Sequence, residues 1–168
     1  MILKNLTKSF YINIIFIILI FSLDRISKLY VIHFYEKNYS SELFSSKFLN
    51  INLIWNEGIA FGLFSFDKNH LYNILTIVIF LVILFIFFMI IKNVGFKKYS
   101  LSMIFGGAIG NLYDRIFYKA VPDFIDFHIE NFHWFIFNVS DIFITIGVIF
   151  MIILEIIDKT DNKINEKI

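Results

Sequence analysis

The chain has 168 residues, of which 58% are hydrophobic and 20% aromatic, and its mean hydropathy is +0.75. A soluble domain cannot bury so much apolar surface, so the composition indicates an integral membrane protein. The formal net charge is +1, and no basic patch stands apart from the lysines beside apolar segments, which argues against a nucleic-acid partner. The sequence has no cysteine, which excludes disulfides, thiolate metal sites and thiol catalysis by the chain itself.

Four apolar segments are long enough to cross a bilayer as helices of about twenty residues. They lie near residues 11–31, 71–91, 101–118 and 139–157. The first resembles an export signal, because Lys4 and Lys8 precede it, but no small-residue cleavage site follows. We therefore interpret it as a span. The sequence predicts a mainly α, polytopic membrane protein with four transmembrane helices in a single domain, residues 1–168.

Lysines before the first span, between the second and third, and after the fourth predict the orientation. By the positive-inside rule these segments and both termini face the cytoplasm, and the segment 32–70 lies outside. The polar residues of the spans, Asp24, Asn111, Asp114 and Asp141, then all lie at the outer edge. We therefore expect the functional end of the bundle to be extracytoplasmic.

The outer segment carries one strand pattern. Leu49, Ile51, Leu53 and Trp55 alternate with polar residues, although Ile54 breaks the alternation. This period of two predicts a half-buried strand. With the glycines that follow, it would form a small extracytoplasmic β cradle on the membrane surface. The alternative is an irregular loop whose aromatic side chains lie in the membrane interface.

The third span combines small and polar residues on one helix face. Gly106 and Gly110 allow a neighbouring helix to approach closely, which on its own indicates packing. Asn111, Asp114 and Arg115 follow on the same face and should point into the bundle.

The two arginines of the chain, Arg25 and Arg115, each directly follow an aspartate. A guanidinium suits bidentate contact with a carboxylate or carbonyl in a site. The alternative is structural ion pairing, of Asp24 with Arg25 or Lys28 and of Asp114 with Arg115.

Two aspartates have the stronger functional case. A carboxylate near hydrocarbon costs roughly 2.5–3.5 kcal/mol on insertion scales, so Asp123 and Asp141 are expected to be used. If they face each other, one stays protonated and one ionised, and such a pair can deprotonate water. We hypothesise that Asp141, at a helix start, is ionised and that Asp123 is the proton donor. Asp126 competes with Asp123, and the residues alone do not choose between them.

No cofactor or metal site is expected. The four histidines lack paired ligand spacing such as H-E-x-x-H. They are His33, His70, His128 and His133.

Two rival classes of protein use similar residues. Intramembrane charges also mark the paths of ion-coupled transporters, but here the inner halves of all four spans are apolar. A noncatalytic assembly subunit, whose charges pair with a partner, is the second rival.

Five motifs occur in a fixed order along the chain. They are Asp24-Arg25-Ile26-Ser27-Lys28, Asn56-Glu57-Gly58-Ile59-Ala60-Phe61-Gly62, Gly106 through Arg115, Val121-Pro122-Asp123-Phe124, and Phe137-Asn138-Val139-Ser140-Asp141. In this order and on four spans they resemble the motifs of the lipoprotein signal peptidases, also called signal peptidase II, which are bacterial membrane aspartic peptidases. Pro122 and Ser140 depart from the valine and alanine usual in that family.

The resemblance implies an activity and its partners. It implies an aspartic endopeptidase that removes signal peptides from diacylglyceryl-modified prolipoproteins at the outer face of the cytoplasmic membrane. An activated water would attack the bond before the lipidated cysteine. The expected partners are these substrates and membrane lipids, with no metal or other cofactor, and the chain is expected to be a monomer.

The resemblance also implies roles for residues. It favours Asp123 over Asp126, so that the catalytic pair is Asp123 and Asp141. The residues expected to line and support the site are Asn56, Gly58, Asn111, Asp114, Arg115 and Asn138. Asp24 and Lys28 are expected to be structural polar residues.

Overall fold

The computed structural model describes residues 2–58, 69–130 and 132–165. Its helices are α1 (Ile2–Asn38), α2 (Asn69–Lys92), α3 (Gly95–Phe117) and α4 (Val139–Asn165). Its strands are β1 (Glu42–Ser45), β2 (Leu49–Asn56), β3 (Val121–Ile129) and β4 (Phe132–Phe137). Three of the predicted spans lie within one of these helices and the third span, 101–118, ends one residue beyond α3, so the mainly helical class is confirmed.

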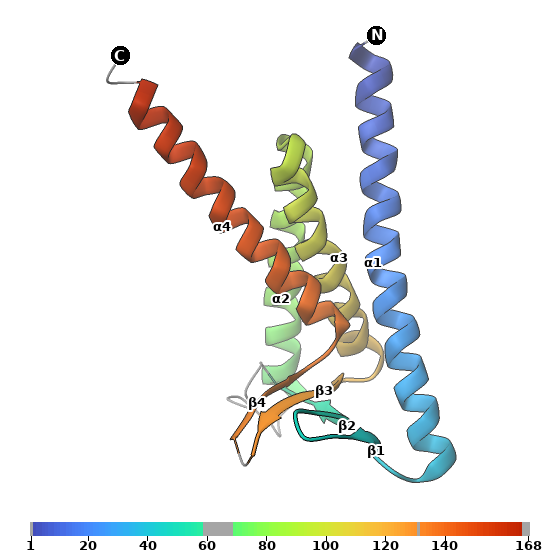
Figure 1. The fold of residues 1–168 in the computed structure, drawn as a ribbon. Helices are drawn as coiled ribbons and strands as arrows, with labels where there is room; N and C mark the ends of the chain where they lie inside the picture. The colour runs from blue at the N-terminus through green and yellow to red at the C-terminus, as the bar shows by residue number, and fades with distance from the viewer. Residues whose placement is uncertain (1, 59–68, 131, 166–168) are drawn as a thin grey trace.

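The sheet lies at one end of the helices (Figure 1). The N-terminal end of α1 and the C-terminal end of α4 both lie at the opposite end, away from the strands. Within the described residues, two helices are long and apolar enough to cross a membrane, α2 over Tyr72–Lys92 and α4 over Val139–Lys159. That α1 and α3 also cross stays a prediction.

The helices expose large apolar side chains and bury charged ones. Ile15 on α1 and Phe85 on α2 are 63% and 65% exposed, whereas Asp24, Lys28 and Asp114 are fully buried. This is the reverse of a soluble bundle. An apolar outer surface is stable in contact with lipid, and polar side chains are then satisfied by one another inside.

Helix α3 lies between α1 and α4, and its glycines make this close packing possible. A Cβ atom added at Gly106 would lie 3.1 Å from the side chain of Ile20 on α1. One added at Gly107 would lie 2.5 Å from the carbonyl oxygen of Ser140 on α4. The packing role predicted for the small residues of this span is therefore confirmed.

The strands form one antiparallel sheet in the order β1-β2-β3-β4. Strand β2 matches the predicted strand and excludes the irregular-loop alternative for residues 49–56. The register shifts between Ile51 and Ile54, where the sequence alternation also breaks. The glycine-rich motif after β2 continues outside the described residues from Ile59 onward.

A small apolar cluster anchors the sheet to the helices. Val31 of α1, Leu53 of β2 and Phe124 of β3 are buried together, with Val139 of α4 packed against them. Through this cluster, the strands that carry polar residues are held at the ends of α1 and α4.

Candidate active site

Strand β3 delivers Asp123 into the interior. Its side chain is only 4% exposed, and both carboxylate oxygens accept hydrogen bonds from amide side chains. Asn56 Nδ2 donates to Oδ2 at 2.8 Å, and Asn138 Nδ2 donates to Oδ1 at 2.6 Å. The backbone N–H of Gly58 donates to Asn56 Oδ1 at 3.0 Å, which leaves the Asn56 amide nitrogen to face Asp123.

Asp141 lies in the first turn of α4, as the sequence predicted. Its backbone N–H donates to Asn138 Oδ1 at 3.2 Å, and its Oδ2 accepts from the backbone N–H of Asn138 at 3.1 Å. This reciprocal pair is a capping box. The other oxygen, Oδ1, accepts from Asn111 Nδ2 at 2.8 Å, so the helix cap leaves that oxygen directed at α3.

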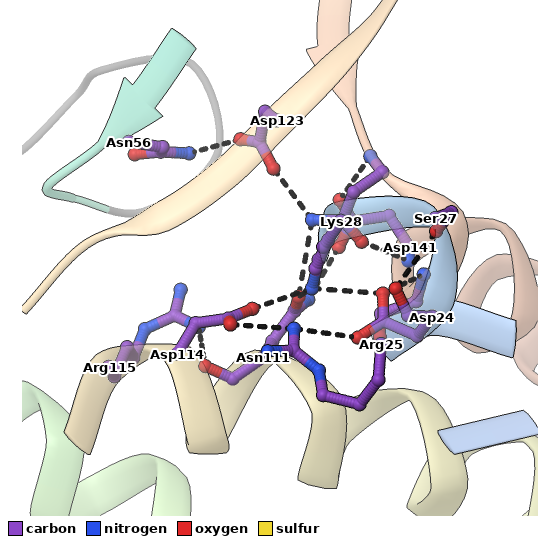
Figure 2. A network of polar contacts seen from close by, with 12 residues as sticks. Asp24, Arg25, Ser27, Lys28, Asn56, Asn111, Asp114, Arg115, Asp123 and Asp141 are labelled. Atoms are coloured by element: carbon purple, nitrogen blue, oxygen red, sulfur yellow. Dashed lines mark hydrogen bonds and ion pairs between the residues drawn. The ribbon is translucent and has the colours of Figure 1, made fainter. Parts of the chain in front are cut away.

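Asn138 links the two aspartates. It is completely buried, its side-chain nitrogen binds Asp123, and its backbone and side-chain oxygen bind Asp141. The same nitrogen also donates to Asn111 Oδ1 at 3.2 Å. Two carboxylates from separate segments therefore converge on one asparagine. Asp126 has a different partner, because its Oδ2 lies 2.9 Å from His133 Nδ1. Figure 2 shows Asp123 and Asp141 on either side of this network.

A buried set of ion pairs lies beneath these residues (Figure 2). Lys28 Nζ lies 2.9 Å from Asp24 Oδ1 and 2.7 Å from Asp114 Oδ2. It also donates to Asn111 Oδ1 at 2.9 Å, which connects the ion pairs to the asparagine that holds Asp141. Arg25 Nη2 lies 2.6 Å from Asp114 Oδ1 and 3.2 Å from Asp24 Oδ2.

The observed ion pairs differ in one respect from the structural ion pairs that the sequence offered as an alternative role for the two arginines. Asp24 pairs with both Arg25 and Lys28, as that alternative proposed. Asp114 pairs across to α1, while the guanidinium of Arg115 donates to the carbonyl oxygen of Asn111 at 3.1 Å. Both carboxylate oxygens of Asp114 already contact cations of α1, Oδ1 with Arg25 and Oδ2 with Lys28.

Asp24 also fixes the start of α4. Its Oδ1 accepts from the backbone N–H of Ser140 at 3.0 Å. The Ser140 hydroxyl is buried and has no hydrogen-bond partner among the described residues, so this serine adds no hydrogen bond there. Pro122, the second departure, is buried on β3 opposite Trp55.

Burial raises the pKa of Asp123 to about 6, from an ordinary value of 3.8. The negative charge of Asp141 adds to this rise, and the hydrogen bonds from Asn56 and Asn138 oppose it. A carboxyl group with this pKa exchanges a proton near neutral pH, which is the property that acid–base catalysis needs.

An apolar cavity of about 580 Å³ opens beside Asp141. Aromatic side chains of β3 and β4, among them Phe127, Trp134 and Phe137, form one wall. Ile142 and Ile146 of α4 form another. An apolar group can therefore lie against the carboxylate end of α4.

Known proteins share both this sequence and this fold. The profile of the family described as signal peptidase (SPase) II matches residues 16–157. The chain belongs to the signal peptidase II family. A lipoprotein signal peptidase of Pelagibacter ubique (strain HTCC1062) is 51% identical to it over 160 residues, covering 95% of this chain and 96% of that protein. One of Anaplasma marginale (strain Florida) is 39% identical over 151 residues, covering 89% and 86%.

A solved structure described as a bacterial membrane enzyme, determined by the in meso method at 2.3 Å resolution, has the same fold as this signal peptidase II family member. The TM-score is 0.69 at 30% identity, covering 89% of this chain and 90% of that one. The resemblance drawn from the five motifs is thus confirmed. The chain is a bacterial membrane protein of a peptidase family.

Proposed function

We propose that this chain is an aspartic endopeptidase that removes signal peptides from diacylglyceryl-modified prolipoproteins, with Asp123 and Asp141 as its catalytic pair. The observation that carries the proposal is their convergence on Asn138 from β3 and from the first turn of α4. Membership of the signal peptidase II family supports prolipoprotein signal peptides as the substrate.

The chemistry follows from one protonated and one ionised carboxyl. A water molecule held between them attacks the carbonyl carbon of the scissile bond, and its proton passes to Asp141. Asp123 gives its proton to the carbonyl oxygen. Collapse of the tetrahedral intermediate breaks the C–N bond. The proton on Asp141 passes to the leaving amine, and a hydroxyl proton of the intermediate returns to Asp123 as the C=O bond re-forms.

The neighbouring polar residues have positioning roles in this proposal. Asn56, Gly58, Asn111 and Asn138 hold the two carboxylates through the hydrogen bonds described above. The buried ion pairs join α1 to the C-terminal end of α3 beneath them. Asp24, Arg25, Lys28 and Asp114 make these ion pairs, and Arg115 supports the same end of α3 through its hydrogen bond to the carbonyl oxygen of Asn111.

The cavity beside Asp141 can accommodate part of the substrate's lipid. We assign it to an acyl chain of the diacylglyceryl group, because the lipidated cysteine adjoins the scissile bond and the cavity wall is aromatic and aliphatic. If all four helices cross the membrane and both termini are cytoplasmic, the end of the bundle that carries the cavity lies at the outer edge of the membrane. The scissile bond of a membrane-anchored precursor lies at that level. The single domain acts as a monomer in this scheme.

The test is cleavage of a diacylglyceryl-modified precursor peptide by purified full-length protein in lipid-containing micelles. Asp123→Asn and Asp141→Asn should each abolish cleavage, because neither amide can exchange the required proton. Asp158→Asn is the matched control, since Asp158 is a surface residue at the far end of α4 and pairs with Lys97. Mass spectrometry of the wild-type product should place the cut directly before the lipidated cysteine.

Thermal unfolding of the two variants distinguishes a loss of catalysis from a loss of the folded state. Both catalytic-pair variants should unfold cooperatively, as the wild-type protein does. Cleavage by Asp123→Asn at a rate near that of wild type would overturn the catalytic assignment. Loss of the folded state together with activity would favour a structural role for these aspartates.

A further inference from the structure

Three side chains with metal-binding donors gather on the β3–β4 hairpin, and one of them, His128, also lines the cavity beside Asp141. Asp126 and His128 are two residues apart on β3, on either side of a shift in the register between β3 and β4. His133 on β4 is directly opposite His128 in the register. One donor atom from each of the three lies within 4.8 Å of the others.

The contacts within this cluster are close. His133 Nδ1 lies 3.0 Å from Oδ1 and 2.9 Å from Oδ2 of Asp126. The rings of His128 and His133 stack, with centroids 5.0 Å apart and an interplanar angle of 21°. The side chain of Asp126 is 8% exposed and that of His133 is 51% exposed, so the cluster lies at the surface with a buried carboxylate at its base.

His128 supplies an independent observation. Its Nδ1 atom is buried and has no hydrogen-bond partner within the described residues. A buried polar atom without a partner calls for an explanation, and an ion that it would bind is one. A simple His133–Asp126 hydrogen bond accounts for two of the three side chains, but it leaves this nitrogen unexplained.

We propose that Asp126, His128 and His133 bind a divalent transition-metal ion, for which Zn²⁺ is the best match. Two imidazole nitrogens and one carboxylate oxygen are a common donor set for zinc, at metal–ligand distances of about 2.0–2.2 Å. Rotation of the half-exposed His133 side chain brings the three donors together. The fourth tetrahedral position is left for a solvent molecule.

The sequence spacing did not predict this site, because the H-E-x-x-H pattern applies to ligands on one helix. On a hairpin, ligands come from positions two apart on one strand and from the opposite strand. An ion bound here would cross-link β3, which carries Asp123, to β4, which leads into Asn138 and α4. It would therefore stiffen the hairpin without taking part in the proposed cleavage. The proposal stands whether or not Asp123 and Asp141 are catalytic.

The experiment is titration of Zn²⁺ into untagged, chelator-treated full-length protein in detergent, with a chromophoric zinc indicator as competitor. One equivalent should bind, and Zn²⁺ should raise the melting temperature. His128→Ala and His133→Ala should each weaken binding by more than about tenfold, since even loss of an outer-shell partner costs 10–100-fold. Co²⁺ in place of Zn²⁺ should give the visible absorption of a tetrahedral site.

His33→Ala is the matched control, because His33 is exposed on α1 outside the cluster. It should bind Zn²⁺ as wild type does. Binding of clearly less than one equivalent by wild type would overturn the proposal, as would wild-type affinity in both cluster variants or an equal loss in His33→Ala. If an alanine variant unfolds, His133→Gln at the half-exposed position decides the question by the same affinity criterion.

Discussion

The side-chain nitrogen of Asn138 lies 2.6 Å from Oδ1 of Asp123, and this contact joins strand β3 to the start of helix α4. Since Asn138 is also the N-cap whose partner is Asp141, moving one aspartate relative to the other requires breaking the helix cap or this bond. The spacing of the proposed catalytic pair is therefore set by one buried asparagine.

Replacing Asn138 with alanine should lower kcat by about 10²-fold, since misplacement of catalytic groups by about 1 Å has effects of that size. The change removes the hydrogen bond to Asp123 and the cap of α4 together. Steady-state cleavage of the lipidated peptide measures it. Ser140→Ala is the neighbouring control and should keep its rate, because the Ser140 hydroxyl makes no hydrogen bond within the described residues. Equal rates for wild type and Asn138→Ala would rule out the positioning role.

The pH dependence of kcat/KM follows from the raised pKa of Asp123, about 6. Below that value Asp123 keeps the proton that it must donate, and above it the proton is lost. We therefore expect kcat/KM to fall as pH rises through about 6, approaching tenfold per pH unit. A second decline is expected at low pH, when the remaining carboxylate of the pair is also protonated. Measurement between pH 4 and 8.5 tests this, and a flat profile from pH 5 to 8 would contradict it.

Removal of Lys28 should destabilise the fold strongly. Lys28→Met keeps an apolar stem but leaves Asp24 and Asp114 without the cation between them. Removing one partner of a buried ion pair costs about 3–5 kcal/mol. Lys97→Met is the matched control, because Lys97 also pairs with two carboxylates, Glu155 and Asp158, but does so at the surface.

Thermal and chemical unfolding in detergent measure the two lysine variants. The Lys97 variant should unfold close to wild type, since exposed ion pairs contribute little. A Lys28 variant as stable as the Lys97 variant would show that the buried ion pairs do not hold the helices together.

Gly110→Ala should disturb the junction of three helices. A Cβ atom there would lie 2.5 Å from Asp24 Oδ2 and against the Ser140 hydroxyl, so α1 or α4 must shift. Overpacking of this kind costs about 1–3 kcal/mol, more than alanine gains over glycine in a helix. Gly106→Ala is the comparison and should cost less, because the nearest atoms, Cβ and Cγ2 of Ile20, lie at 3.1 Å and α1 has to shift by only a few tenths of an ångström. Melting temperature and cleavage rate should both fall for Gly110→Ala, and a gain in stability would contradict the packing argument.

The sequence predicted the helices and one strand because their patterns are local. Long apolar runs identify α1 to α4, and alternation identifies β2. Strands β1, β3 and β4 were not predicted. Four consecutive residues of β3, Val121 to Phe124, are all buried, so the strand shows no alternation between a polar and an apolar face. The sequence feature that marked this segment was the family motif around Asp123, not an alternation of polar and apolar residues.

By itself, the sequence determined the membrane class, the family motifs and the identity of the polar residues, because composition and spacing are properties of the chain. Only the tertiary structure decided which of these residues meet. Asp114 pairs with Arg25 rather than with adjacent Arg115, Asp126 turns to the two histidines, and Asp123 and Asp141 share Asn138. These contacts depend on strand register and on the close approach of α1, α3 and α4, which are set by packing between segments distant in the chain.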